Sequence, residues 1–339
     1  TYYNAALTYS FNRKKYLVPE YPQRSITFIS AYDNMSPSDR FGAHDKDNFF
    51  TILKWDNDNK RLLYNQQVLE FNYEFNGGLE TFFSLKHEKQ RAIGDLDFGD
   101  LTISEAKVSI QFKPGQSIVN TKQRRVQTNY DKPEFYISHA MGFDGVLGSK
   151  FPYNMTEASI YNRFWLNSWG YISCKLTGGI QWNKVPYMLL IMPPSNTSFI
   201  AQDFNFNLLK SMEFLNDRYA KLDVSWNLNG KIFNRIPLLK KLKWREYIGF
   251  SCLWGTVSDK NKPTITMVED PANPGMMIEK SSWPEGVRMM DPKKPYMEFV
   301  VGIHNILKIF HIQYVRRLSY TGYEGVQKNG VRFRVEISF

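Results

Sequence analysis

The chain has 339 residues, of which 42% are hydrophobic and 22% are charged, so it carries enough apolar side chains to fold and is not a disordered tail. Lysine and arginine outnumber aspartate and glutamate by 43 to 33, and the net charge of +10 favours anionic partners, either phosphate-bearing lipid or nucleic acid, between which charge alone does not choose. No run approaches the roughly 18 apolar residues that a membrane-spanning helix needs, so a helical membrane protein is excluded.

The dominant pattern is an alternation of apolar and polar residues with a period of two, which is typical of strands with two different faces. Residues 221–229 are the clearest example, and an Asn76-Gly77-Gly78 turn joins two further segments into a predicted hairpin. The pattern predicts about fifteen strands, at residues 1–12, 24–34, 47–55, 61–75, 79–93, 103–113, 133–146, 153–166, 169–182, 200–213, 217–230, 244–257, 296–303, 307–320 and 330–339.

These segments suit either a soluble β-sandwich or a barrel in a membrane, and three features favour the barrel. Segments of about ten residues match a tilted bilayer crossing. Charged and amide residues recur on one face, which suits a wet lumen better than a packed core. Tryptophan and tyrosine collect near segment ends, as interfacial girdles require, at Trp165, Trp169, Tyr171, Trp182, Tyr187, Trp244 and Trp254.

The predicted fold class is therefore all-β, a transmembrane antiparallel β-barrel of about sixteen strands. Bacterial barrels have an even strand number and periplasmic termini, so we expect one strand before Thr1 or a different pairing of the first segment. We expect residues 1–339 to form one barrel domain with a further N-terminal periplasmic region ahead of it. The same count places the loops at 114–132 and 258–294 on the outer side of the membrane.

Two stretches resemble a known family. The first is Val185-Pro186-Tyr187 to Asn196 with Phe204-Asn205-Phe206 and residues 213–219, and the second is residues 229–246. They are similar to a Bacteroidetes outer-membrane family of unknown function, in which a carboxypeptidase-like regulatory domain precedes a C-terminal barrel of the BamA and TamA surface-antigen type. The resemblance implies a place in the outer membrane of a Gram-negative bacterium.

The resemblance has two departures. Where the family pattern has an acidic residue and a His-Pro-Gly-Asn turn, this chain has Ile191 and Pro193-Pro194-Ser195-Asn196. We also read residues 213–217 as a short turn, whereas assembly barrels carry a long inserted loop with a conserved arginine. This reading argues against an insertase role.

The second stretch has the character of a periplasmic turn. Pro237 interrupts strand pairing, Trp244 suits an interface, and the cations suit lipid phosphate or an acidic partner, although a merely solvated basic turn fits as well. The residues that carry this motif and turn are Asn234, Pro237, Lys240, Lys241, Trp244, Arg245 and Glu246.

Two other groups of residues are candidates for contacts. Phe333, Val335, Ile337 and Phe339 alternate at the C-terminus and resemble the signal by which barrel-assembly machinery takes up its clients, or simply an edge strand. Lys122, Arg124 and Arg125 in the 114–132 loop are candidates for binding lipopolysaccharide phosphates.

The sequence contains no constellation typical of an enzyme, a metal site or a cofactor site. His304 and His311 are seven residues apart, so on one strand they would face opposite sides, and we expect them to be solvated. We do not expect nucleic acid as a partner, because the cations do not gather on one element and the sequence shows no recognisable nucleic-acid-binding fold.

We therefore predict a non-enzymatic outer-membrane β-barrel that participates in outer-membrane protein or lipoprotein biogenesis or export. Its expected partners are outer-membrane lipid, lipopolysaccharide and other outer-membrane or periplasmic proteins. The alternative is a solute channel or transporter.

Overall fold

A computed structural model describes residues 2–12, 22–41, 60–96, 98–121, 125–269 and 275–335. Thirteen strands in this part of the chain form one antiparallel sheet, namely β1 (Tyr3–Ser10), β2 (Arg24–Met35), β3 (Arg61–Glu74), β4 (Leu79–Ile93), β5 (Leu101–Phe112), β8 (Glu134–Phe143), β9 (Tyr153–Trp165), β10 (Tyr171–Gln181), β11 (Arg218–Asn227), β12 (Arg245–Thr256), β15 (Tyr296–Ile306), β16 (Phe310–Arg317) and β17 (Asn329–Val335).

The connections carry the remaining elements. Two small hairpins consist of β6 (Ile118–Asn120) with β7 (Arg125–Gln127), and β13 (Ile265–Glu269) with β14 (Met277–Ser281). The helical elements are α1 (Pro237–Leu242) and the 3-10 turns η1 (Pro37–Arg40), η3 (Val146–Gly148), η4 (Asn167–Trp169), η5 (Tyr187–Leu189), η6 (Phe233–Arg235) and η7 (Asp259–Asn261). None of the helices in the described ranges is long and apolar enough to cross a membrane.

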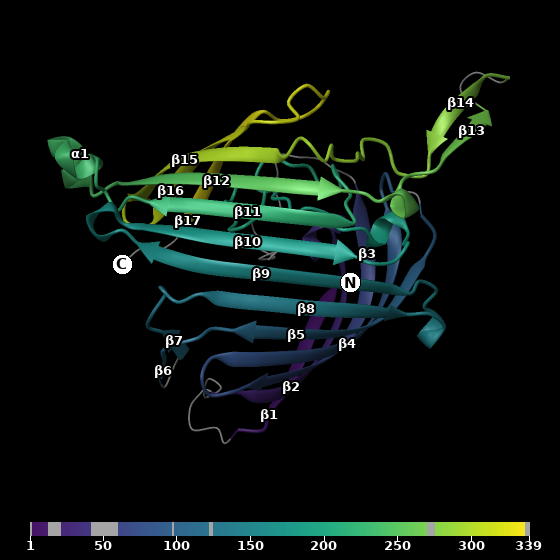
Figure 1. Ribbon diagram of the computed structural model, residues 1–339, viewed down its shortest axis with the longest axis horizontal. Coiled ribbons are helices and arrows are strands. Elements are labelled where there is room, and N and C mark those ends of the chain that lie inside the picture. The colour runs from purple at the N-terminus through teal and green to yellow at the C-terminus, as the bar shows by residue number, and fades with distance from the viewer. Residues whose placement is uncertain are drawn as a thin grey trace.

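Each strand of the large sheet pairs with the next one along the chain, so the sheet is an up-and-down meander. Figure 1 shows it curling into a barrel wall with the strands running side by side. β1 and β17 are the two edge strands, and among the described residues they do not pair with each other. The wall is therefore open along the seam between β1 and β17.

The outer face of the wall is apolar and its inner face is polar, which is the reverse of the arrangement in a soluble protein. Outward side chains such as Phe83, Ile137 and Phe299 are apolar and stay exposed, at 44%, 48% and 37%. Inward side chains such as Glu88 and Arg317 are charged and only 2% exposed. An apolar belt around a polar interior requires lipid on the outside, which confirms the predicted all-β transmembrane barrel architecture.

The barrel has two ends, named here by the elements that project from them. The α1 end holds the turn 228–244, the hairpin β6–β7 and the end of β17, and the hairpin end holds β13–β14 (Figure 1). The prediction that the 114–132 loop lies on the same side as the 258–294 loop is wrong, because these two loops lie at opposite ends. The segment 200–213, counted as a strand, added one crossing between these two loops and so reversed the assigned side of the 114–132 loop.

Thirteen of the predicted strand segments correspond to the strands of the sheet. Segment 47–55 lies outside the described residues, and segment 200–213 is not a strand. Phe204 and Met212 have φ angles of 60° and 58°, which turn the backbone away from the extended conformation. This segment belongs to a long irregular connection instead.

Aromatic side chains mark both ends of the wall. Trp165 and Trp169 are 56% and 43% exposed at the α1 end, and Trp182 and Trp254 are 53% and 45% exposed at the hairpin end. Two such belts match the interfacial girdles that the sequence predicts. Tyr187 is an exception, because it packs against the buried cluster beneath the hairpin end rather than facing outward.

Candidate functional site

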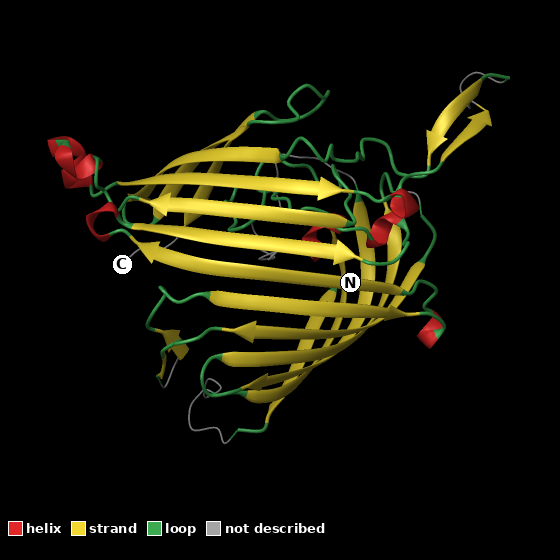
Figure 2. Cartoon of the chain, viewed as in Figure 1, coloured by secondary structure: helices red, strands yellow, loops and turns green. Residues whose placement is uncertain are grey.

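The connection between β10 and β11, residues 183–217, folds back into the barrel, and we call it the luminal insert. In Figure 2 irregular chain runs between the two walls of strands. Its apolar residues Met188, Leu190 and Met192 are at most 1% exposed and pack in a cluster with Leu62 and Ile103 of the wall. The prediction that residues 213–217 form a short turn is therefore wrong, because these residues are the last part of a long connection that enters the barrel.

A buried ion pair joins the insert to β16. The Arg317 guanidinium donates two hydrogen bonds to the Glu213 carboxylate, from Nη2 to Oε1 at 2.6 Å and from Nη1 to Oε2 at 3.0 Å. The two side chains are 0% and 2% exposed. Arg288 from the hairpin-end loop adds a third cationic contact, with Nη1 3.7 Å from Glu213 Oε1. This bidentate pair fixes both the position and the orientation of the insert.

A second carboxylate, Glu298 on β15, holds the middle of the insert. Its Oε2 and Oε1 atoms accept hydrogen bonds from the backbone N–H groups of Asn207 and Leu208, both at 2.8 Å. The Tyr296 hydroxyl donates a further hydrogen bond to Glu298 Oε1 at 2.7 Å. These bonds satisfy two backbone donors that have no strand partner.

The insert also reaches the edge strand β17. The Phe333 backbone accepts a hydrogen bond from the Ala201 N–H at 2.7 Å and donates one to the Phe199 carbonyl at 2.8 Å, which makes a short parallel bridge between Ile200 and Phe333. We call residues 199–201 the strap. The fully buried Arg332 donates to the Asn207 carbonyl from the same strand. The edge of β17 is thus held from inside by the chain's own insert.

The insert packs closely against the wall at two glycines. A Cβ at Gly255 of β12 would lie 2.1 Å from Asn216 Oδ1, and a Cβ at Gly330 of β17 would lie 2.8 Å from Leu208 Cδ2. A larger residue at Gly255 would push the fully buried Asn216 side chain away from β12, whereas at Gly330 the end of the flexible Leu208 side chain can move aside.

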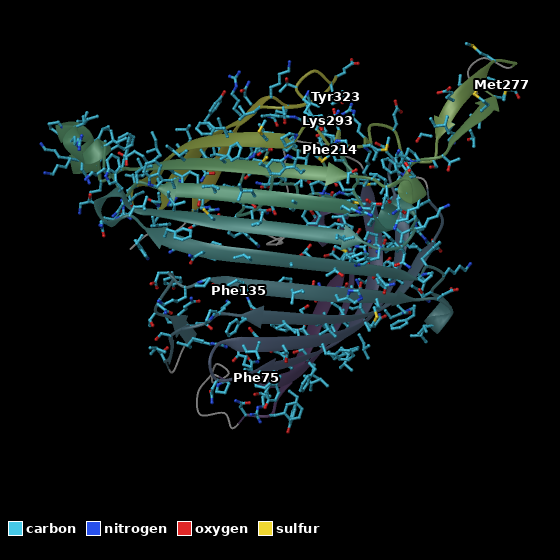
Figure 3. The ribbon with its side chains drawn as sticks, in the orientation of Figure 1. Phe75, Phe135, Phe214, Met277, Lys293 and Tyr323 are labelled. Carbon is cyan, nitrogen blue, oxygen red and sulfur yellow. The ribbon has the colours of Figure 1, made fainter. Side chains whose placement is uncertain are left out.

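Loops at the hairpin end close over the insert. Asp217 Oδ2 accepts hydrogen bonds from the Ser258 N–H and from Asn261 Nδ2, both at 3.0 Å. The ring of Tyr320 packs against Phe214 of the insert with 5.0 Å between the ring centroids (Phe214 is labelled in Figure 3). Burial raises the pKa of the Tyr320 hydroxyl, which accepts a hydrogen bond from the Asp291 N–H at 3.0 Å.

A cavity of about 900 Å³ remains in the lumen beside the insert. Its walls come from β3 to β5 and β8 to β11, and Phe204 and Asn205 of the insert line one side. The lining is strongly charged with both signs, the principal groups being Lys86, Glu88, Glu105, Lys107, Glu134, Glu157, Lys175, Lys221 and Asp223. Several of them neutralise one another, as Lys86 does at 3.5 Å from both Glu88 and Glu105.

The predicted motif at residues 229–246 forms a single ordered turn at the α1 end. Pro237 begins α1 and Lys240 and Lys241 are exposed in its last turn. Glu246 accepts hydrogen bonds from the backbone N–H groups of Ile232 (3.0 Å) and Phe233. Asn234 lies in η6 before the helix, Trp244 is half-buried, and Arg245 opens β12 opposite His304. The structure thus brings these seven residues together.

Only some of the other predicted contact residues lie within the described part of the chain. Phe333 and Val335 lie on the outer face of β17 and are 44% and 58% exposed, while Ile337 and Phe339 lie outside the described residues. Lys122 and Arg124 also lie outside them, and Arg125 in β7 forms an ion pair with Glu74 at 2.5 Å. Because β6–β7 lies at the α1 end, the assumption that this loop and the 229–246 turn lie on opposite sides is wrong.

The prediction that His304 and His311 are solvated is also wrong. They lie on β15 and β16, which are joined by a short turn, and are 5% and 4% exposed with their ring centroids 4.3 Å apart. The two histidines are seven residues apart, but the chain reverses direction between them, so their rings lie next to each other on neighbouring strands. Asn305, Leu307 and Lys308 take positive φ angles in this turn, which contains no glycine or proline to announce it.

Sequence reasoning missed the insert and its anchors Glu213, Glu298, Arg317 and Arg332. Residues 204–207 alternate Phe-Asn-Phe-Asn and so imitate a strand. The available signal was the pair of apolar doublets, Leu208-Leu209 and Phe214-Leu215, which breaks the period of two. Within the described part of the chain, no three histidine, cysteine, aspartate or glutamate side chains are grouped so that they could hold a metal ion.

Two solved structures of outer-membrane proteins are similar to this chain in fold. BamA from Haemophilus ducreyi lacking POTRA domains 1–3 is similar in structure, with a TM-score of 0.54 and 10% identity over 98% of this chain and 61% of that chain. CdiB from Acinetobacter baumannii has a TM-score of 0.49 and 11% identity over 97% of this chain and 49% of that chain. The chain thus spans about half to three fifths of the solved structures it matches. No curated protein matches the sequence.

The fold defines the class as a transmembrane β-barrel that is similar in fold to the BamA barrel. A family model described as "Family of unknown function (DUF5686) C-terminal domain" matches residues 47–261, more than half of the chain. The chain belongs to this family.

Proposed function

We propose that this protein is an outer-membrane β-barrel that participates in outer-membrane protein or lipoprotein biogenesis or export, and that β17 is the strand on which a client segment is received. The observation that carries the proposal is the edge of β17, which pairs with the three-residue strap of the luminal insert. The BamA-like fold supports the barrel, and the family resemblance supports the role.

The strap is a weak partner for a strand edge. It contributes two backbone hydrogen bonds to Phe333, and a backbone hydrogen bond is worth a net of about 0.5–1.5 kcal/mol. An extended client segment that paired along the length of β17 would make more bonds than the strap does. Edge strands recruit added strands in this way, so displacement of residues 199–201 is favourable in the presence of a client.

The luminal anchors complement this arrangement. Glu213, Glu298 and Asp217 hold the remainder of the insert by buried hydrogen bonds, so the strap can leave the edge without the insert leaving the barrel. The lumen then stays occupied while the edge is engaged. The proposed role uses the edge of β17 and does not use a path through the lumen, so a lumen that stays filled by the insert is compatible with it.

The proposal is tested by placing the photo-crosslinking residue p-benzoylphenylalanine at Phe333 in the full-length protein in its native membrane. The matched control is the same residue at Ile312, which is also exposed on the outer face, at 42% against 44%, but lies on β16 between two paired strands. Adducts with other envelope proteins at position 333 and few at 312 are expected. Equal adducts at both positions, or none at 333, would count against the edge as the client site.

A solute channel is the second candidate, and the luminal cavity of about 900 Å³ favours it. Its charged lining suits a polar solute, provided that the insert leaves a continuous path. Planar-bilayer recordings of the purified full-length protein separate the two candidates. A stable conductance that Lys107→Glu alters in ion selectivity would support transport, and absence of conductance would support the edge mechanism.

A further inference from the structure

The turn 228–244 at the α1 end, here called the basic turn, is an ordered projection from the barrel (Figure 1). Glu246 fixes its first half by accepting the Ile232 and Phe233 N–H groups. Asn305 fixes its second half, because Asn305 Nδ2 donates to the Lys243 carbonyl at 2.7 Å. Its exposed side chains are therefore presented in a defined arrangement.

Four aliphatic side chains of the basic turn face outward. Leu238 is 69% exposed, and Ile232, Ile236 and Leu242 are 49%, 45% and 44% exposed. Exposed aliphatic side chains concentrated on one short projection mark a surface that is covered by an apolar partner.

The cations of the basic turn alternate in sequence with these aliphatic side chains. Arg235, Lys240, Lys241 and Lys243 are all exposed, and no acidic residue occurs from Asn229 to Arg245. A helical turn that pairs aliphatic side chains with lysines matches the surface of a bilayer rich in anionic headgroups, where acyl chains and phosphates lie at adjacent depths.

The basic turn is continuous with the aromatic girdle of the barrel. Lys231 Nζ donates to Ser168 Oγ at 2.7 Å and lies 5.2 Å from the centroid of the Trp169 ring. Trp226 Nε1 in turn donates to the Trp169 carbonyl at 2.9 Å. Because exposed tryptophans sit at the membrane interface, this contact sets the turn at headgroup depth.

From these observations we infer that the basic turn is seated in the leaflet at the α1 end and binds anionic phospholipids. The aliphatic side chains enter the boundary of the acyl chains, and the exposed cations bind lipid phosphates. The turn acts as a second membrane anchor beside the barrel wall, and the inference depends on the membrane-spanning barrel but not on the biogenesis role.

The test uses a fluorophore attached to Leu238→Cys in a chain in which Cys174 and Cys252 are replaced by alanine. The full-length protein is reconstituted in vesicles of phosphatidylcholine, with or without phosphatidylglycerol, and quenching by lipids with brominated acyl chains is compared with quenching by aqueous iodide. The control label is at Met277→Cys, an exposed apolar side chain of similar exposure, 53%, on the projecting β13–β14 hairpin (Figure 3).

We expect the label at 238 to be quenched by brominated lipid at least several-fold more strongly when phosphatidylglycerol is present, and the label at 277 to be quenched by iodide in both vesicles. Lys240→Glu with Lys241→Glu should abolish the phosphatidylglycerol effect while the unboiled protein keeps its folded gel mobility. Equal lipid quenching in both vesicles would overturn anionic selection. Quenching of the label at 238 by iodide alone would overturn the anchor and indicate a protein partner.

Discussion

The Arg317 guanidinium on β16 donates two hydrogen bonds to the Glu213 carboxylate of the luminal insert, across 104 residues of sequence. Both side chains lie inside the barrel and neither is more than 2% exposed. The pair joins the insert to the strand beside β17, so the position of the insert and the shape of the seam are linked through it.

Replacing Arg317 with methionine should destabilise the folded barrel by about 3–5 kcal/mol, because the Glu213 carboxylate is left buried without its bidentate partner. The double variant Arg317→Met with Glu213→Gln should recover part of this loss, since neither charge is then unpaired. The effect is measured on gels of unboiled protein, as the urea concentration at which half of the protein no longer migrates as the folded band.

Arg334→Ala is the matched control for this prediction. Arg334 pairs with Asp203, but that carboxylate is 65% exposed, so the cost should stay below about 1 kcal/mol. Equal midpoints for Arg317→Met and Arg334→Ala would contradict the structural role of the buried pair.

Glu298→Gln should loosen the middle of the insert. The carboxylate accepts the N–H groups of Asn207 and Leu208 on separate oxygens, and an amide side chain provides only one acceptor oxygen. We expect a loss of about 1–3 kcal/mol of local stability, seen as faster hydrogen exchange in peptides that contain these two residues. Glu134→Gln, on the cavity wall away from the insert anchors, should leave that exchange unchanged.

Gly255→Ala should displace the insert from β12. The added Cβ would overlap Asn216, and overpacking of this kind costs about 1–3 kcal/mol. Gly178→Ala is the control, because a Cβ there lies 3.4 Å from the nearest atom, the Tyr219 carbonyl oxygen. If protease cleavage within residues 183–217 is equally slow in both variants, close packing at Gly255 does not hold the insert.

Ala201→Pro tests the strap directly. Proline lacks the N–H group that donates to the Phe333 carbonyl, so one of the two bridge bonds is lost. Crosslinking from p-benzoylphenylalanine at position 333 to envelope proteins should then increase, while crosslinking from position 312 should not change. A decrease at 333 would mean that the strap assists the client rather than occupying its place.

The alternation of side chains was sufficient to predict the wall, because each strand faces lipid on one side and a polar lumen on the other. It was not sufficient for the insert, where residues 204–207 alternate without forming a strand. The Glu213–Arg317 and Glu298–Asn207 contacts depend on which strands curve past the insert, and that information lies in the sheet order rather than in any local pattern. The miscounted crossing also reversed the assigned side of the 114–132 loop.

The basic turn shows the opposite case, in which a local pattern was informative. Pro237, the lysines and Trp244 lie close together in the sequence and remain together in the structure, because a short turn between adjacent strands is built from local contacts. Only its first anchor, Glu246, belonged to the predicted motif, whereas Asn305 comes from the neighbouring strand.

The central claim is that this chain forms a membrane-integral β-barrel, and the most direct measurement is the gel mobility of the membrane-extracted full-length protein with and without boiling, after a urea wash of the membranes. The structure predicts that the protein stays in the washed membranes and that the unboiled form migrates faster than the boiled form. Release by urea into the soluble fraction, with no difference in mobility on boiling, would contradict the account.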